Sequence, residues 1–343
     1  MGRLGAAVIG AGYWGPNLVR NLAGHDDVDL RWVCDLDLER ARRVAGRHGD
    51  IATTTNVEAV LSDPDVDVVA IATPAGTHVD LGLAALDAGK HVLVEKPLAS
   101  TLESGQKLVA AARAADRVLM CDHTYCYTPA VERIRSLIES GDIGDVLYVD
   151  SVRINLGLVQ HDIDVVWDLA PHDLSILDHV LPPGSRPTAV AATGADPAGV
   201  GQRCVAHLSL PLGNGGLAHS HVNWLSPTKI RRIVIGGTRR MLVWDDLQPA
   251  QRLQIFDCGV EVELSDDDRR QQLISYRTGD MVAPALREGE ALASVVNELV
   301  AAIRGARDPM TSGEAGLRVL DVLESASRSL AEGGSLIALE QAW

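Results

Sequence analysis

The 343-residue sequence predicts an α/β protein with two domains. Two observations lead to this fold class. Residues 1–122 alternate continuous apolar runs with helical patterns, which is typical of strands buried on both faces of a doubly wound parallel sheet. After residue 123 strand-like runs follow one another at short spacing, which indicates a large, mostly antiparallel sheet. Because 343 residues exceed what one hydrophobic core usually serves, we expect domains at 1–122 and 123–343.

The first domain is expected to consist of successive βαβ units with right-handed crossovers. Asp37 suits the N-cap of one of its helices, and Gly89 suits the C-cap of another. Its strands are expected at residues 4–9, 29–34, 66–72, 91–94 and 117–121. Its helices are expected at residues 14–22, 38–48, 57–61, 77–88 and 102–114.

The second domain is expected to have fewer helices and more strands. The turn-forming segments 211–216 and 236–237 separate neighbouring strands. Its strands are expected at residues 146–155, 188–192, 204–210, 216–224, 230–235 and 240–244. Its helices are expected at residues 129–139, 171–180, 290–305 and 313–332.

Composition excludes several classes of protein. A net charge of -15 argues against a nucleic-acid binder, since phosphate contacts need a basic surface. No apolar run reaches the ~18 residues of a membrane span, and no signal peptide precedes the first strand, so we expect a cytoplasmic protein. The 5 cysteines contain no CxxC pair, so neither a disulfide framework nor a metal site is expected.

A glycine-rich motif follows the first expected strand directly and precedes a helix. The motif is Gly10-Ala11-Gly12-Tyr13-Trp14-Gly15. In this context Gly10 permits the tight turn, Gly12 lets the backbone approach a pyrophosphate, and Gly15 allows close packing of helix and strand. The helix N-terminus then attracts the phosphates. The alternative is that these glycines only form a tight turn.

Asp35 ends the second expected strand, twenty residues past Gly15. A carboxylate there accepts hydrogen bonds from ribose hydroxyls and repels a 2′-phosphate, which favours NAD over NADP. Arg40 and Arg42 lie nearby and would weaken this preference. The alternative for Asp35 is a helix cap.

Further candidates follow the third and fourth expected strands, where ligands bind in such sheets. Thr73 and Pro74 are expected to line the cofactor, and His78 either joins them or makes a structural hydrogen bond. Glu95-Lys96-Pro97 ends the fourth strand. The Lys96 ammonium would polarise a reacting oxygen during hydride transfer, unless it is a surface lysine that extends to water.

A second polar group lies at Trp167-Asp168-Leu169-Ala170-Pro171-His172. Asp168 and His172 are four residues apart, so they share one face if the segment is helical. Histidine suits proton exchange near neutral pH, and a neighbouring carboxylate can orient it. The alternative is that Asp168 caps a helix that begins at Pro171, with His172 at the surface.

Taken in order, these motifs resemble the Gfo/Idh/MocA family of dinucleotide-dependent sugar and cyclitol oxidoreductases over nearly the whole chain, including the late segment 276–280. The resemblance implies an N-terminal Rossmann domain with NAD as cofactor and a C-terminal α/β domain whose open sheet face is often an oligomer interface, so we expect a homodimer or homotetramer. It also places Tyr13, Trp14, Glu95, Lys96 and Trp167 beside the cofactor.

The resemblance also assigns chemical roles. It implies that His172 takes the hydroxyl proton, that Asp168 tunes the site and that Lys96 hydrogen-bonds the reacting oxygen, with all three within ~3–5 Å of one point. The family pattern DxGxHxxD has Ala170 and Ser175 here in place of its glycine and last aspartate, which alters backbone geometry and one polar contact.

Residues 153–157 and 167–173 are similar to a branch that oxidises C3 of UDP-N-acetylglucosamine or its uronic acid. In that reading Arg153, Asn155 and Tyr127 contact the sugar substrate, while surface or packing roles remain open for them. Gln160 and His161 would touch either ligand. Alternatives are a 3-ketoreductase of a deoxysugar, a dehydrogenase of an aminoglycoside or cyclitol in antibiotic biosynthesis, and a dinucleotide sensor without catalysis.

Overall fold

The computed structural model describes residues 2–157, 159–160, 163–261, 275–277 and 279–340. The chain forms two compact units, which are described separately here. The N-terminal unit comprises residues 1–128 and 289–320, and the C-terminal unit comprises residues 129–288 and 321–343. The units therefore differ from the boundary expected at residue 122, because residues 289–320 join the N-terminal unit. That residues 1–122 and 123–343 fold as independent domains stays a prediction.

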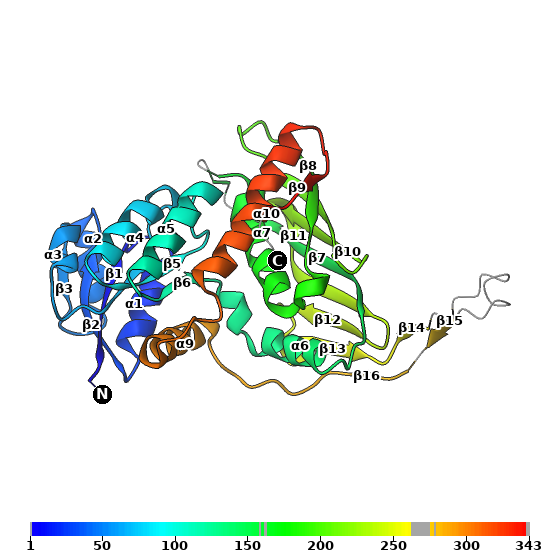
Figure 1. Ribbon diagram of the computed structural model, residues 1–343, viewed down its shortest axis with the longest axis horizontal. Helices are drawn as coiled ribbons and strands as arrows, with labels where there is room; N and C mark the ends of the chain where they lie inside the picture. Colours follow the sequence, from blue (N-terminus) through cyan, green and yellow to red (C-terminus); the bar gives the residue numbers. More distant parts are fainter. Residues whose placement is uncertain (1, 158, 161–162, 262–274, 278, 341–343) are drawn as a thin grey trace. The chain divides into compact units, whose positions relative to one another are not determined.

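The N-terminal unit contains the expected doubly wound sheet, which is parallel throughout (Figure 1). The strand order is β3-β2-β1-β4-β5-β6, so the order reverses beside β1. Ligands bind such sheets at the carboxyl ends of the strands near that reversal. The strands are β1 (Leu4–Ile9), β2 (Val28–Cys34), β3 (Ala52–Thr54), β4 (Val68–Ile71), β5 (His91–Glu95) and β6 (Leu119–Asp122).

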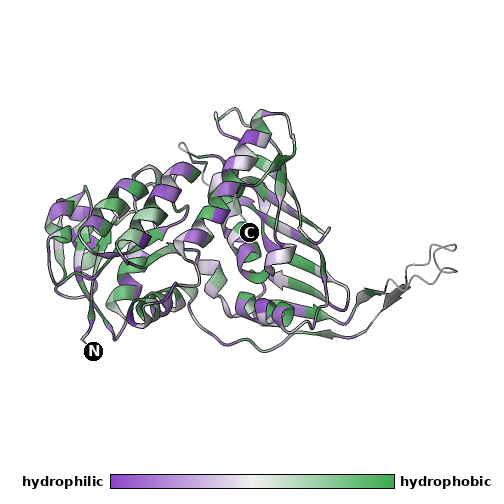
Figure 2. Cartoon of the chain, in the orientation of Figure 1, coloured by the Kyte–Doolittle hydropathy of each residue, from purple (hydrophilic) through white to green (hydrophobic). Residues whose placement is uncertain are grey.

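Helices cover this sheet, and its strands are mostly hydrophobic (Figure 2). Leu18 and Leu22 from α1, Val44 from α2 and Val295 and Leu299 from α9 share one buried cluster with β1. The contribution of α9 explains why a late segment of the chain belongs to this unit. The helices are α1 (Gly15–Ala23), α2 (Leu38–Ala45), α3 (Val57–Leu61), α4 (His78–Asp87), α5 (Leu102–Ala114), α9 (Ala291–Gly305) and the short η1 (Ala75–Thr77) and η2 (Thr124–Tyr127).

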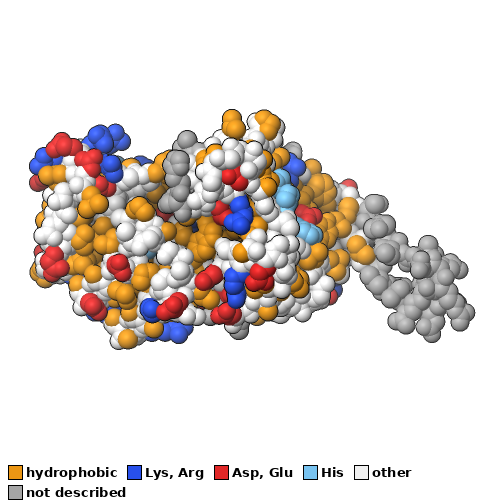
Figure 3. All heavy atoms as spheres, turned by 90° about the horizontal axis from the view of Figure 1, so that it is seen from above, with side chains coloured by type: hydrophobic (Ala, Val, Ile, Leu, Met, Phe, Trp, Pro, Cys, Tyr) orange, Lys and Arg blue, Asp and Glu red, His pale blue; other side chains and the backbone are white. Residues whose placement is uncertain are grey.

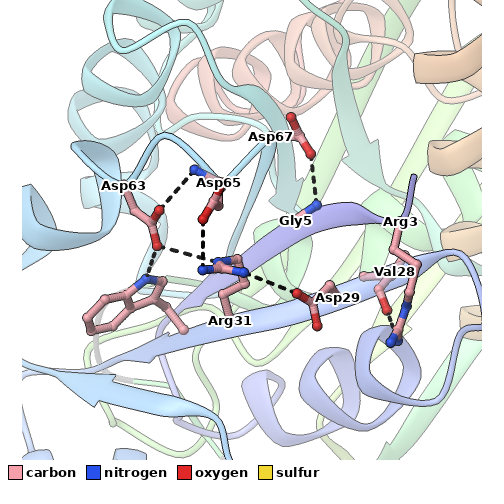
Figure 4. A network of polar contacts seen from close by, with 9 residues as sticks. Arg3, Gly5, Val28, Asp29, Arg31, Asp63, Asp65 and Asp67 are labelled. Carbon is pink, nitrogen blue, oxygen red and sulfur yellow. Dashed lines mark hydrogen bonds and ion pairs between the residues drawn. The ribbon is translucent and has the colours of Figure 1, made fainter. Parts of the chain in front are cut away.

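A network of charged groups links β2 to the loop before β4, at the amino ends of β1 and β4 (Figure 4). The Arg31 guanidinium lies 3.2 Å from Asp29, 3.5 Å from Asp63 and 3.1 Å from Asp65. The Trp32 indole N–H donates to Asp63 at 2.7 Å. This network lies at the edge of the sheet away from the ligand-binding carboxyl ends, so we assign it to stability.

The C-terminal unit is built on a nine-stranded sheet. Its order is β16-β13-β12-β11-β7-β10-β9-β8-β17, and the pairings are antiparallel except that β10 runs parallel to β7. The strands are β7 (Val146–Leu156), β8 (Ala189–Ala195), β9 (Val205–Pro211), β10 (Leu217–Asn223), β11 (Leu225–Gly237), β12 (Met241–Asp245), β13 (Leu253–Phe256), β16 (Met281–Val282) and β17 (Ile337–Ala338), with a separate pair β14 (Gly259–Glu261) and β15 (Ser275–Arg277).

Helix α7 packs against β7, β9 and β10 of this sheet. It begins earlier than expected, because the Asp164 carboxylate caps it by accepting from the backbone N–H groups of Val166 and Trp167. Pro171 therefore lies inside the helix and does not begin it, which corrects the expected start at residue 171. The helices of this unit are α6 (Pro129–Glu139), α7 (Val165–Val180), the second part of α10 (Gly313–Ala331), and the short η3 (Pro183–Ser185) and η4 (Pro249–Gln251).

Among the described residues, no helix combines the length and the apolar character needed to cross a membrane.

Candidate active site

Close backbone packing requires glycine at two positions of the motif between β1 and α1. Gly10 adopts a φ of +100°, and a Cβ there would lie 2.5 Å from the Ala72 carbonyl oxygen at the end of β4. At Gly15 a Cβ would lie 2.0 Å from the Gly10 carbonyl oxygen. These distances are shorter than any allowed contact, so the turn forms only with glycine at both positions.

Gly12 differs from these two glycines, because no atom of the described residues lies within 4 Å of where its Cβ would be. Packing therefore does not demand glycine here, and the missing side chain leaves open space at the start of α1. The first turn of α1 has no side-chain cap, and Pro16 occupies one of its first positions. The positive end of the helix dipole and the open space beside it fit the pyrophosphate of a dinucleotide.

Asp35 joins this motif to the end of β2. Its carboxylate accepts a hydrogen bond from the Ala11 N–H at 2.7 Å and another from the Asp37 N–H at 2.8 Å. The Arg40 guanidinium lies 3.5 Å away and also faces Asp37. Asp35 is thus neither exposed nor the cap of α2, since Asp37 makes the capping contact.

Two large apolar side chains near Asp35 are almost completely exposed. Tyr13 is 93% exposed and Leu36 is 96% exposed. This exposure leaves both side chains available to a ligand, and contact of Tyr13 with the cofactor stays a prediction. Tyr13 was expected from the sequence, whereas Leu36 was missed; an apolar residue between two acidic ones was the available signal.

His78 connects two of the loops expected at the cofactor. Its ring nitrogens lie 2.8 Å from the Thr73 carbonyl oxygen and 2.9 Å from the Pro97 carbonyl oxygen, and the side chain is buried. Burial lowers the pKa of His78, so the neutral ring donates to one carbonyl at a time. This geometry matches the structural role that the sequence left open. Thr73 also contacts the Thr77 hydroxyl at 2.7 Å, and Pro74 is exposed.

Lys96 follows β5, is half-buried and precedes a cis peptide bond to Pro97. The adjacent Glu95 pairs in register with Asp122, the last residue of β6. Burial raises the pKa of the Glu95 carboxyl well above its usual range, and Asp122 raises it further. The Trp14 indole N–H donates to Asp122 at 2.8 Å. Sequence reasoning missed Asp122, although an acid at the end of a parallel strand was a signal for it.

Helix α7 holds the second expected group, and its helical geometry places Asp168 and His172 on one face. Both side chains are half-buried. The Asp168 carboxylate accepts a hydrogen bond at 2.9 Å from the indole N–H of Trp224, which sequence reasoning missed. The Trp167 indole donates to Ser327 at 2.9 Å. Because the cap of α7 is Asp164, Asp168 is not the cap that the alternative interpretation expected.

Arg153 lies in the interior of the C-terminal unit and is 3% exposed. Its guanidinium donates to Asp173 from Nε at 3.0 Å and from Nη2 at 2.6 Å. The Ser151 hydroxyl donates to the other oxygen of Asp173 at 2.6 Å. The alternative of a surface residue on an edge strand is therefore wrong, since β7 lies between β10 and β11. Asn155, two residues further on, is half-buried.

Tyr127 is buried in the N-terminal unit, with its hydroxyl 2.9 Å from the Thr311 hydroxyl. Because Thr311 donates to the Cys121 carbonyl at 2.7 Å, Tyr127 is the donor to Thr311. Burial raises the pKa of the Tyr127 phenol. These contacts match the packing role that the sequence left open.

The remaining candidates divide between the two units. Lys96 belongs to the N-terminal unit, and Asp168 and His172 belong to the C-terminal unit, so their expected convergence stays a prediction. Gln160 is half-buried. His161, Thr278 and the side chains of Tyr276 and Arg277 lie outside what the structure describes.

Models of known protein families match both parts of the chain. Residues 4–123 match the oxidoreductase family with an NAD-binding Rossmann fold, and residues 131–243 match the GFO/IDH/MocA C-terminal domain. UDP-N-acetylglucosamine 3-dehydrogenase of Acidithiobacillus ferrooxidans is 29% identical over 91% of this chain and 93% of its own length. Inositol 2-dehydrogenase of Rhizobium meliloti is 26% identical over 95% of this chain and 96% of its own.

Solved structures agree with this assignment. The Acidithiobacillus ferrooxidans enzyme superposes with a TM-score of 0.81 at 25% identity and covers 97% of this chain and 99% of its own. GenD2 from gentamicin A biosynthesis, in complex with NAD, superposes with a TM-score of 0.83 at 24% identity, over 99% of this chain and 97% of its own. The predicted fold class, the NAD cofactor and the family resemblance are thereby confirmed: this chain belongs to the Gfo/Idh/MocA family of NAD-binding oxidoreductases.

Proposed function

We propose that this oxidoreductase transfers a hydride from the C3 hydroxyl carbon of a nucleotide-linked amino sugar to NAD⁺. The observation that supports this most is the 29% identity to a UDP-N-acetylglucosamine 3-dehydrogenase over 91% of the chain. Residues 153–157 and 167–173 resemble the same branch. Oxidation at C3 gives a ketone that suits later transamination.

NAD⁺ held at the glycine-rich motif between β1 and α1 would supply the hydride acceptor for the proposed reaction. His172 takes the proton from the substrate hydroxyl as the general base. Asp168, held by the Trp224 indole, orients His172 and stabilises the positive charge that forms on the imidazole when it takes the proton. The Lys96 ammonium hydrogen-bonds the same oxygen and stabilises the charge that develops on it.

The cofactor preference is part of the proposal. Asp35 carries a carboxylate beside the motif that holds the dinucleotide, and a 2′-phosphate would meet this charge. Arg40 is already within ion-pair distance of Asp35 and Asp37, which reduces the positive charge it could offer. We therefore expect NAD to bind more tightly than NADP.

A cyclitol is the second candidate substrate, because inositol 2-dehydrogenase matches 95% of the chain at 26% identity. The same residues would serve this reaction, since a ring hydroxyl is again oxidised. They would also serve the reverse reaction, the reduction of a 3-keto sugar. A substrate panel distinguishes these possibilities.

We also propose a homodimer or homotetramer formed through one face of the nine-stranded sheet. Val152 of β7 and Val234 of β11 each lie between two buried residues, and Ile154 of β7 is the register partner of Ile230 of β11. All four side chains are half-exposed. Exposed histidines border hydrophobic side chains in Figure 3. Half-exposed apolar side chains on neighbouring strands are typical of an interface. A cytoplasmic location stays a prediction from the sequence.

NADH formation by the purified protein tests the reaction. The panel contains UDP-N-acetylglucosamine, its uronic acid, UDP-glucose, myo-inositol and an aminoglycoside. We expect turnover with one of the two amino sugars, and Lys96→Ala and His172→Ala should lose turnover while they still bind NADH. Lys107→Ala, which removes an exposed lysine from α5, is the control. Turnover with myo-inositol alone would show that the substrate is a cyclitol and not a nucleotide sugar. Turnover at the wild-type rate in both the Lys96 and the His172 variant would overturn the roles assigned to these residues.

A further inference from the structure

Two acidic side chains end neighbouring strands in the N-terminal unit. Glu95 is the last residue of β5, Asp122 is the last residue of β6, and the two are register partners in the parallel sheet. Two carboxylates held side by side away from water repel each other strongly. The sheet therefore favours a state in which the pair holds one proton.

The hydrogen bonds around Asp122 identify which member of the pair carries the charge. Asp122 is 1% exposed, and its two oxygens accept from different donors: the Trp14 indole N–H at 2.8 Å and the Thr124 hydroxyl at 2.7 Å. An indole N–H can only donate, and a carboxylate accepts well at both oxygens. These contacts stabilise Asp122 in its ionised form.

Glu95 has the opposite surroundings. Its Oε2 atom is buried and has no hydrogen-bond partner among the described residues, which is costly for a carboxylate and tolerable for a protonated carboxyl. Burial raises the pKa of Glu95, and the charge of Asp122 raises it further, while Lys96 lowers it. Burial also raises the pKa of Asp122, but Trp14, Thr124 and Lys96 oppose this effect. Two further titratable groups are near the pair in the chain: the buried thiol of Cys121 and the buried imidazole of His123, which flank Asp122.

We propose that Glu95 and Asp122 act as a positioning pair that shares one proton, with Asp122 ionised and Glu95 protonated, and that Asp122 sets both the Trp14 indole in the cofactor loop and the charge balance at Lys96. The proposal rests on the proposed function for the role of Lys96. It assigns Glu95 a task different from the direct cofactor contact expected from the sequence.

The contact with Trp14 lets Asp122 affect two parts of the proposed cofactor site, the glycine-rich loop and the region of Lys96. Trp14 occupies the N-cap position of α1, next to the open space at Gly12, and Asp122 lies 108 residues further along the chain. The indole N–H bond therefore ties the phosphate-binding loop to the strand beside Lys96. With one proton on the pair, Lys96 faces one negative charge from Glu95 and Asp122 and not two.

Infrared difference spectroscopy tests the protonation state directly. A protonated carboxyl has a carbonyl stretch that a carboxylate lacks, and ¹³C-labelling of glutamate shifts the band when it arises from a glutamate. We expect the spectrum of the wild-type protein minus that of Glu95→Gln at pH 7 to contain this band. If the difference spectrum contains only carboxylate bands, Glu95 is ionised and the pair does not share a proton.

Titration with NADH, followed by the fluorescence of the bound nucleotide, tests the positioning role without a substrate. Glutamine has the shape and donor capacity of a protonated glutamate, so Glu95→Gln should weaken binding by less than about threefold. Asp122→Asn removes the charge that faces the Trp14 indole and should weaken binding at least about tenfold. Equal losses in the two variants, or a larger loss in Glu95→Gln, would overturn the assignment.

Matched controls come from the network at the other edge of the same sheet. Trp32 donates to Asp63 as Trp14 donates to Asp122, so Asp63→Asn and Trp32→Phe repeat the same chemical changes away from the site. Both controls should bind NADH as the wild-type protein does. Urea unfolding of all variants shows whether any loss of binding arises from unfolding.

A double-mutant cycle shows whether Asp122 acts through Trp14. Trp14→Phe and Trp14→Phe/Asp122→Asn should lose NADH affinity to a similar extent, because the second change removes a bond that the first has already broken. Additive losses would show that Asp122 does not act through the indole. None of these measurements needs turnover. A protein that is inactive with every sugar of the panel but gives the expected infrared band and NADH affinities would contradict the proposed function and would leave the proposal about Glu95 and Asp122 intact.

Discussion

Replacing Gly12 by alanine is expected to weaken NADH binding without destabilising the fold. In the part of the chain that the structure describes, nothing lies within 4 Å of the position that the new methyl group would occupy, so these residues accommodate it. A glycine-to-alanine change at a compatible position stabilises a protein by about 0.4–1 kcal/mol, because the unfolded chain loses freedom. The same methyl group enters the space assigned to the pyrophosphate, and a tenfold loss of affinity corresponds to about 1.4 kcal/mol.

The matched variant Gly10→Ala should behave in the opposite way. Its Cβ would lie 2.5 Å from the Ala72 carbonyl oxygen, and its φ of +100° disfavours any other residue. Backbone strain of this kind costs about 1–3 kcal/mol. Overpacking costs about 1–3 kcal/mol more. We therefore expect a clear loss of stability in Gly10→Ala.

Urea unfolding and NADH titration of both variants separate the two effects. The expected result is a stable Gly12→Ala that binds NADH at least about tenfold more weakly, and a destabilised Gly10→Ala. A Gly12→Ala protein that binds NADH as tightly as the wild type would refute the view that this glycine makes room for the cofactor.

Three further predictions address stability and positioning. Arg153→Met leaves a buried carboxylate on α7 without its charged partner and should lower the free energy of unfolding by ~3–5 kcal/mol in urea; a loss below about 1 kcal/mol would contradict a tight ion pair. Trp224→Phe removes the donor to Asp168 and should lower kcat for the sugar about tenfold, with unchanged affinity for NADH; unchanged kcat would show that this bond does not position Asp168. Hydrogen bonding by Arg307 lowers the pKa of Glu298, so the ionised Glu298 stabilises the fold above pH ~4.3 and this contribution is lost as the pH falls below that value. The free energy of unfolding of Glu298→Gln in urea should therefore differ most from that of the wild type near pH 7.

Much of the N-terminal unit could be predicted because its strands are continuous apolar runs separated by clear helical patterns. The glycine motif, Asp35 and Lys96 all follow strands, and the chain order of a doubly wound sheet places such positions at one edge. The short β3 was missed, because three partly exposed residues carry no periodic pattern. The packing of α9 on the N-terminal unit was missed as well, since it depends on contacts distant in sequence.

The contacts of the candidate site residues could be predicted less well. Pairing of Trp14 with Asp122 and of Arg153 with Asp173 depends on which side chains the folded units bring together, which no local pattern encodes. The start of α7 was expected too late because Pro171 suggested a first turn, whereas Asp164 caps the helix and the proline is accommodated inside it. Four-residue spacing nevertheless predicted that Asp168 and His172 share a helix face.

Transfer of deuterium from C3 tests the central claim most directly. UDP-N-acetylglucosamine labelled with deuterium at C3 is incubated with the protein and NAD⁺, and the reduced cofactor is examined by mass spectrometry. The proposed reaction predicts reduced cofactor that carries one deuterium atom and a slower initial rate than with unlabelled sugar. Reduced cofactor without deuterium, formed at the same rate, would show that the hydride does not come from C3 and would contradict the proposed function.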